Sequence, residues 1–169
     1  MLYCVQKMKT YRNFYSLVSA DLGKYDGKYR RHLQHSLWDK FSDFDALKKR
    51  ELKNLANFVV EIVKADVLNL SLLKTLPFAD ADQKIVSFLE DVLQQIFDAK
   101  EGCHVSQHAF EQLFKSPKMK TFRIQIRMFI CLFIVPKLDK EEIVPSSPLF
   151  RKRIDHVLDT LSVDQGALL

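Results

Sequence analysis

Three residues near the middle of the chain carry side chains that bind metal ions in other proteins. Cys103, His104 and His108 lie in one short segment, and the two histidines would share a helix face at i, i+4. No fourth ligand follows at a familiar spacing, and the segment comes directly after Gly102, at a predicted helix start where histidine is unremarkable. We therefore predict no metal site and no cofactor.

Catalytic motifs are missing from the sequence as well. It has no glycine-rich phosphate loop, no GxSxG motif and no paired carboxylates with a partner motif. The acidic pairs Asp80/Asp82 and Glu90/Asp91 are explained by helix-start electrostatics and by a solvated helix face. We predict a protein that is not an enzyme.

Two basic groups have the charge needed to contact RNA. In the first, cations crowd the start of a predicted helix, where the helix dipole disfavours them by about 0.3–1 kcal/mol and an external anion would relieve that cost. In the second, cations form an i, i+3, i+7 stripe, and each phosphate they neutralise would steepen the salt dependence of binding. Solvated helix faces are the alternative, because no aromatic residues interleave with either group. The two predicted RNA-facing groups are Lys48, Lys49, Arg50 and Lys53, and Lys120, Arg123 and Arg127.

The net charge of +5 is distributed unevenly along the 169 residues. Residues 1–53 carry +6, residues 54–114 carry −5 and residues 115–169 carry +4. This order suits an acidic surface for a basic protein partner together with basic surfaces for RNA. The longest apolar run is too short to span a membrane, the N-terminus lacks the features of a signal peptide, and the three cysteines form no CxxC pair. We expect a reducing compartment, the cytosol or nucleus.

Apolar residues follow helical spacing along nearly the whole chain, and only four glycines are available for turns, so we predict an all-α fold. A loop over residues 23–29, containing Gly23 and Gly27, is expected to end the first helix. Asp80 and Gln83 form a capping pair that should start a long helix. The predicted helices cover residues 13–22, 30–44, 47–65, 80 to about 101, 106–115, 122–135 and 148–161, with one further turn at 71–76.

Residues 122–135 also alternate between apolar and polar side chains, as a half-buried strand does. We predict a buried helix there, ended by Pro136, because the run fits one helical face and no second strand is available to pair with it. Successive helix pairs with short turns predict stacked antiparallel helical hairpins in a HEAT-like repeat array. We expect a domain over residues 1–135, a charged linker over 136–147, and a C-terminal helix with a tail over 148–169.

Several segments, in order, resemble those of one family. Residues 4–17 (CVQKMKTYRNFYSL) match a CxQxKTYNPFYxLL pattern, and residues 35–41 (HSLWDKF) match FSLWDxF. Residues 55–59 and 68–74 are similar to NLxxLVAxLLxxxxLxLSVLK. Together they resemble the MA-three domain of nucleolar proteins that also carry a middle domain of translation initiation factor four-G. The family's Asn-Pro is Arg12-Asn13 here, and its acidic residue before Lys-Thr is Met8.

The resemblance implies an MA-three type helical fold in a non-enzymatic scaffold of the nucleus and nucleolus. Such a scaffold would act in small ribosomal subunit biogenesis and processing of its ribosomal RNA. Its implied partners are a DEAD-box RNA helicase related to initiation factor four-A and pre-ribosomal particles, with no membrane and no small-molecule substrate. The family's middle domain is absent here, so we expect a C-terminal part of a larger protein, or a divergent or partial product.

We predict that the acidic central segment faces a basic partner surface, while the basic groups approach pre-ribosomal RNA. A direct RNA-binding module is the main alternative, and the same fold in translation initiation or splicing is another. Trp38 and Phe41 are interpreted as core residues rather than a peptide pocket. The predicted partner-binding residues are Asp66, Asp80, Asp82, Glu90 and Asp91.

Overall fold

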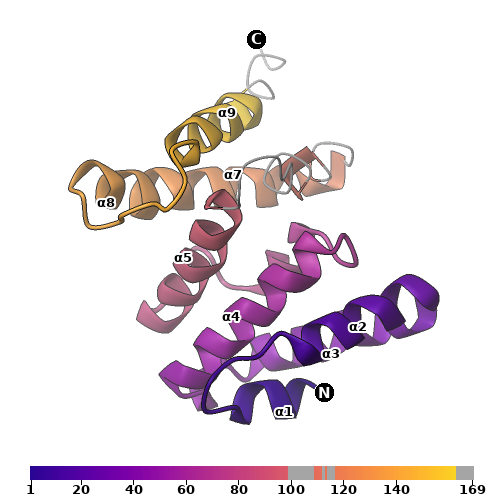
Figure 1. The fold of residues 1–169 in the computed structure, drawn as a ribbon. Helices are drawn as coiled ribbons and strands as arrows, with labels where there is room; N and C mark the ends of the chain where they lie inside the picture. The colour runs from indigo at the N-terminus through magenta and orange to yellow at the C-terminus, as the bar shows by residue number, and fades with distance from the viewer. Residues whose placement is uncertain (99–108, 112, 114–116, 163–169) are drawn as a thin grey trace. The chain divides into compact units, whose positions relative to one another are not determined.

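A computed structural model describes residues 1–98, 109–111, 113 and 117–162, and the chain divides into two compact units, residues 1–93 and 94–169. The described residues form helices and no strand, which confirms the all-α prediction (Figure 1). Within them, no helix is both long enough and apolar enough to cross a bilayer. The predicted division at residues 135 and 147 stays a prediction.

The first unit is built around one long central helix, α4, whose inner face is the predicted apolar stripe. Leu55, Phe58, Val59 and Ile62 on this helix are completely buried, because they recur at helical spacing and α1 and α2 both pack against it (Figure 1). In order, the unit contains α1 (Leu2–Lys7), α2 (Phe14–Tyr25), α3 (Gly27–Ser42), the 3-10 turn η1 (Phe44–Ala46), α4 (Lys49–Lys64), the 3-10 turn η2 (Leu70–Thr75) and most of α5 (Gln83–Phe97).

Aromatic side chains join α3, η1 and α5 within this unit. The rings of Phe41 and Phe44 lie 5.7 and 5.0 Å from the ring of Phe88, both edge-to-face. Trp38 is half-buried, and its indole N–H donates to the carbonyl of Leu72 in η2 at 2.9 Å. Two of the segments that carry the family resemblance therefore contact each other through Trp38, and Trp38 and Phe41 contribute to the core.

The predicted loop over residues 23–29 is wrong. Helix α2 runs through Gly23 to Tyr25, and α3 begins at Gly27, so only Asp26 separates them. Glycine at position 23 permits close packing and does not form a turn, because a Cβ there would lie 2.4 Å from Val67 Cγ1. The Asp26 carboxylate accepts from the Lys28 N–H at 2.7 Å and caps α3.

Helix α5 begins at Gln83, later than the start at Asp80 that the capping pair predicted. The Asp82 carboxylate accepts from the Ile85 N–H at 2.8 Å, and the Asp82 carbonyl accepts from Val86. Asp82, and not Asp80, is therefore the residue that caps this helix.

The second unit contains the end of α5, η3 (Pro117–Met119), α7 (Lys120–Phe129), the π-helical segment η4 (Ile130–Ile134), α8 (Val135–Asp139) and α9 (Phe150–Ser162). The ring of Phe97 stacks on Phe110 at 5.5 Å and meets Phe150 edge-to-face at 6.0 Å. The hydroxyl of Ser147 accepts from the Leu149 N–H in the turn that precedes α9, which begins at Phe150, two residues later than predicted. The predicted 106–115 helix falls mostly outside the described residues, of which 109–111 and 113 are helical.

Pro136 does not end the helix that precedes it, contrary to the prediction. The chain passes from α7 through η4 into α8 and stays helical to Asp139. Proline lacks the N–H that would bond to the residue four positions earlier. Just before it, the Val135 N–H donates to the Ile130 carbonyl, five residues back, so the wider turn of η4 brings Pro136 into the first turn of α8.

Candidate functional site

The start of α4 carries the first predicted RNA-facing group, and all four of its side chains are exposed. Lys48 is the N-cap residue, and the others follow in the first turns of the helix. We call this group the basic cluster; it consists of Lys48, Lys49, Arg50 and Lys53.

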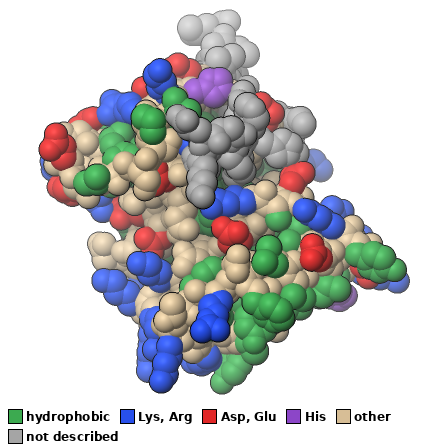
Figure 2. All heavy atoms as spheres, in the orientation of Figure 1, with side chains coloured by type: hydrophobic (Ala, Val, Ile, Leu, Met, Phe, Trp, Pro, Cys, Tyr) green, Lys and Arg blue, Asp and Glu red, His purple; other side chains and the backbone are tan. Residues whose placement is uncertain are grey.

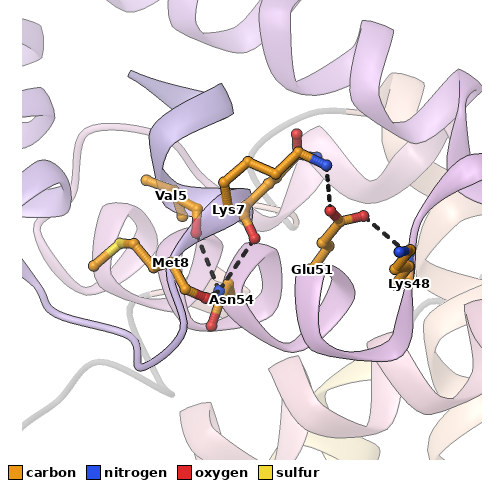
Figure 3. A network of polar contacts seen from close by, with 7 residues as sticks. Val5, Lys7, Met8, Lys48, Glu51 and Asn54 are labelled. Carbon is orange, nitrogen blue, oxygen red and sulfur yellow. Dashed lines mark hydrogen bonds and ion pairs between the residues drawn. The ribbon is translucent and has the colours of Figure 1, made fainter.

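The predicted need for an external anion at this helix start is not supported, because the chain supplies its own. One carboxylate oxygen of Glu51 accepts from the Lys48 N–H at 3.1 Å, and the other lies 2.5 Å from the Lys7 ammonium (Figure 3). Glu51 is not among the residues predicted from the sequence, although a Glu three residues after an N-cap is a capping-box position. An internal carboxylate therefore offsets the positive charge at the start of α4.

The titration of this pair follows from the same contacts. The hydrogen bond from Lys7, then that from the Lys48 N–H, holds the pKa of the Glu51 carboxyl below its usual 4.5. The same Glu51 carboxylate raises the pKa of the Lys7 ammonium above 10.5. Both groups are therefore charged at neutral pH.

Asn54, one turn further along α4, binds the C-terminal end of α1. Its side-chain N–H group donates to the carbonyl of Val5 at 3.1 Å and to that of Met8 at 2.9 Å, with a longer bond to Gln6 (Figure 3). These carbonyls belong to the last turn and the C-cap residue of a six-residue helix, where most backbone acceptors lack helical partners. Helix α1, which the sequence analysis did not predict, is thus held to α4 by the Asn54 amide and the Lys7–Glu51 ion pair.

The predicted partner-binding carboxylates do not form one surface. Asp66 follows the C-terminal end of α4, whereas α5 starts beside the other end, because the Lys84 ammonium donates to the carbonyls of Asp45 and Leu47. The sixteen residues of α4 span about 24 Å, so Asp66 stands well apart from Asp80 and Asp82. We call the exposed residues Asp80 and Asp82 the acidic pair; it lies at the end of the unit that also carries the basic cluster.

The remaining two predicted carboxylates are less accessible. Glu90 is buried at 8% exposure, and Asp91 is half-buried. Burial raises the pKa of Asp91, Lys53 and Lys49 act in the opposite direction, and Glu90 raises it further. Asp91, from the predicted acidic surface, therefore lies near Lys53 and Lys49 of the basic cluster within the first unit. Charge blocks that are separate in the sequence are adjacent in the fold.

The predicted stripe on α7 is also divided by burial. Lys120 is exposed, but Arg123 is buried at 7% exposure and donates to the Leu113 carbonyl at 3.1 Å. Arg127 is half-buried, and its Nε lacks a hydrogen-bond partner. Lys120 is the one residue of this stripe that is fully exposed, so the i, i+3, i+7 spacing predicted the helix face correctly but not its exposure.

Metal-binding groups are not found among the described residues. The segment containing Cys103, His104 and His108 lies outside them. Cys4 and Cys131 are free and exposed thiols.

Comparison with known proteins finds one family model that matches part of this chain. Residues 1–69 match the family model of the MA3 domain, which confirms the resemblance carried by the sequence motifs. The matched region covers α1 to α4 and therefore includes the basic cluster, Glu51 and Asn54. No solved structure matches the chain.

The relatives found among curated proteins share one name. The nucleolar MIF4G domain-containing protein 1 homolog of Drosophila melanogaster is 26% identical over 160 residues, which cover 93% of this chain and 19% of the relative. Nucleolar MIF4G domain-containing protein 1 of Homo sapiens is 28% identical over 152 residues, which cover 90% and 18%. The chain thus spans about a fifth of the length of these relatives. Their names support the predicted nuclear and nucleolar localisation.

Proposed function

We propose that this chain is a protein-interaction scaffold, without enzymatic activity of its own, in nucleolar biogenesis of the small ribosomal subunit and processing of its ribosomal RNA. The observation that carries the proposal is a double match. Residues 1–69 fit the MA3 domain, and about nine-tenths of the chain aligns with proteins named as nucleolar. Pre-ribosomal particles are the assemblies on which such a scaffold would act.

The proposed protein partner is a DEAD-box RNA helicase of the initiation factor four-A type. A basic surface on that partner would be attracted by exposed carboxylates, and the acidic pair offers two of them on the segment that leads into α5. Glu90 is buried, Asp91 is half-buried, and Asp66 follows the opposite end of α4, so none of the three adjoins the pair as an exposed carboxylate. The proposed contact therefore centres on Asp80 and Asp82.

A titration of purified helicase against charge variants tests this contact. Asp80→Lys reverses an exposed charge without removing a cap, so the affinity should fall about threefold to tenfold, as expected for a charged contact worth about 1 kcal/mol. Asp82→Asn is the suitable second variant, because its amide oxygen still accepts from the Ile85 N–H. Asp39→Lys, an exposed carboxylate on α3, is the matched control. Unchanged affinity for both test variants would refute this contact.

Direct RNA binding is the second candidate function. The observation that favours it is the exposure of all four side chains of the basic cluster at one helix start. Their charge is only partly offset, because Glu51 already pairs with Lys7 and caps the helix. RNA phosphates would then contact the N-terminal end of α4 and not the buried Arg123 of α7.

A further inference from the structure

Helix α2 is amphipathic in the opposite sense to an ordinary surface helix. It buries small residues, Ser16, Ser19, Ala20 and Gly23, against the rest of the first unit. Its large apolar side chains point to solvent. We call these exposed residues the apolar face of α2; they are Phe14 (61% exposed), Leu17 (53%), Leu22 (39%) and Tyr25 (91%).

Close packing on the inner side fixes this orientation. Val67 Cγ1 occupies the space that a Cβ of Gly23 would need, and the Ser19 hydroxyl donates to the Met1 sulfur at 3.2 Å. A large side chain cannot replace these small ones without moving the helix outward. The side chains of the apolar face therefore contribute little to the core, and their exposure lowers the solubility of the chain.

The exposed apolar surface extends beyond one helix. Tyr3 on α1 is 68% exposed, and Figure 2 shows hydrophobic side chains gathered over the region of α1 and α2. Single exposed apolar residues need no explanation, but a contiguous group of large ones is typical of an interaction surface.

Cations lie at both ends of this surface. Lys24 lies two turns after Leu17 on the same side of α2, and Arg12 and Lys28 are exposed just beyond its two ends. Of the two acids, Asp26 is the cap of α3, and Asp21 lies between Leu17 and Tyr25. Acidic flanks on a ligand would therefore be attracted at the two ends of this surface, where basic flanks would be repelled.

We propose that the apolar face of α2 binds an amphipathic helix with acidic flanks from a partner protein. The anchors follow helical spacing from Phe14 to Tyr25, as two packed helices require. Single-stranded RNA fits less well, because bases stack on aromatic rings and two of the four anchors are leucines. The ring of Phe14 also meets Tyr15 edge-to-face at 5.3 Å. This surface uses none of the residues of the acidic pair or the basic cluster, so it stands or falls separately from the proposed function.

Selection from a display library of helical peptides, with the full chain as target, provides the probe. The recovered peptides should have one apolar face and acidic flanks. Their affinity is then measured by fluorescence anisotropy for the unmodified chain and for Leu17→Asp, which should weaken binding at least about tenfold. Val144→Asp is the matched control, because Val144 is 87% exposed in the second unit. Circular dichroism melting confirms that each variant is folded.

Each outcome of this experiment either supports or overturns the proposal. Acidic amphipathic peptides that lose affinity with Leu17→Asp and keep it with Val144→Asp support the proposal. Recovery of basic peptides, of peptides insensitive to Leu17→Asp, or of none overturns it. The proposal is also overturned, in favour of RNA, if oligouridine binds the unmodified chain, loses affinity with Leu17→Asp, and no peptide competes with it for the site.

Discussion

Glu51 is a single side chain with two structural tasks. It caps α4 by accepting from the Lys48 N–H, and it binds the Lys7 ammonium of α1. Its side chain is only 4% exposed, whereas that of Lys7 is 52% exposed. Neutralising the carboxylate would thus leave the Lys7 ammonium and the cations at the start of α4 without their internal anion.

Glu51→Gln should lower the free energy of unfolding at neutral pH by about 0.5–1 kcal/mol, because the amide oxygen can still accept from the Lys48 N–H but the ion pair with Lys7 is lost. The folded state holds the pKa of Glu51 below 4.5, so this contribution is fully present above the unfolded pKa and is lost as the pH falls through the folded pKa. Urea unfolding of both proteins at neutral pH and near pH 3 measures it. The difference between them should shrink in acid.

Glu61→Gln is the control on the same helix. Glu61 pairs with Lys64 at 3.3 Å on the partly exposed side of α4, and surface pairs of this kind contribute little. An acid-insensitive difference for Glu51→Gln, or an equal effect of Glu61→Gln, would contradict the role assigned to Glu51.

Gly23→Ala should destabilise the protein by about 1–3 kcal/mol, even though alanine favours helices. The reason is steric, because the new Cβ would lie 2.4 Å from Val67 Cγ1. Thermal melting checks the prediction. In a chain that already carries Val67→Ala, which removes the clashing Cγ1, Gly23→Ala should cost less stability than it does in the unmodified chain. Gly27→Ala, whose nearest neighbour would be Arg30 Nη2 at 4.0 Å, should be close to neutral. A neutral Gly23→Ala would show that α2 and Val67 are not tightly packed.

Among the secondary-structure elements, α1 depends most on distant contacts. Six residues are too few for a stable isolated helix, so its order comes from α4. Asn54→Ala removes the donor to the carbonyls of Val5 and Met8 and should cost about 1–3 kcal/mol.

Amide hydrogen exchange localises this effect. Exchange should accelerate in α1 more than in α5 when Asn54 is replaced by Ala, because local opening follows the loss of local contacts. Equal acceleration in both helices would mean that Asn54 stabilises the whole unit and does not specifically hold α1.

The elements could be predicted from the sequence where the apolar spacing is strong, and the failures have physical causes. The stripe of α4 located that helix to within a few residues. Gly23 and Pro136 indicated breaks, but contact with Val67 and the wide turn of η4 override those local preferences. Helix α1 has too few residues for its spacing to be recognised.

The candidate site was only partly predictable for the same kind of reason. Spacing grouped Lys120, Arg123 and Arg127 on one face but did not reveal that Arg123 bonds to the Leu113 carbonyl and is buried. Separation along the chain suggested distinct acidic and basic surfaces, whereas folding places Asp91 near Lys53 and Lys49. Exposure and distance between segments are properties of the packed structure, so the sequence could not supply them.

For the whole molecule, the two candidate functions predict different responses to salt. If RNA binds the basic cluster, replacing Lys48, Lys49 and Arg50 by Gln should reduce the slope of log affinity against log salt by about 2, since each phosphate contact contributes ~0.7 for single strands. Filter binding to a single-stranded RNA at several salt concentrations measures this slope. An unchanged slope would exclude the basic cluster as the RNA contact.

The scaffold proposal is tested most directly by affinity capture from a nuclear extract, with the full chain as bait and with or without ribonuclease. We expect recovery of a DEAD-box helicase and small-subunit processing factors that survives ribonuclease and declines with Asp80→Lys but not with Asp39→Lys. Recovery that disappears with ribonuclease would instead favour direct RNA binding, and recovery of neither class of protein would contradict a scaffold role for this chain.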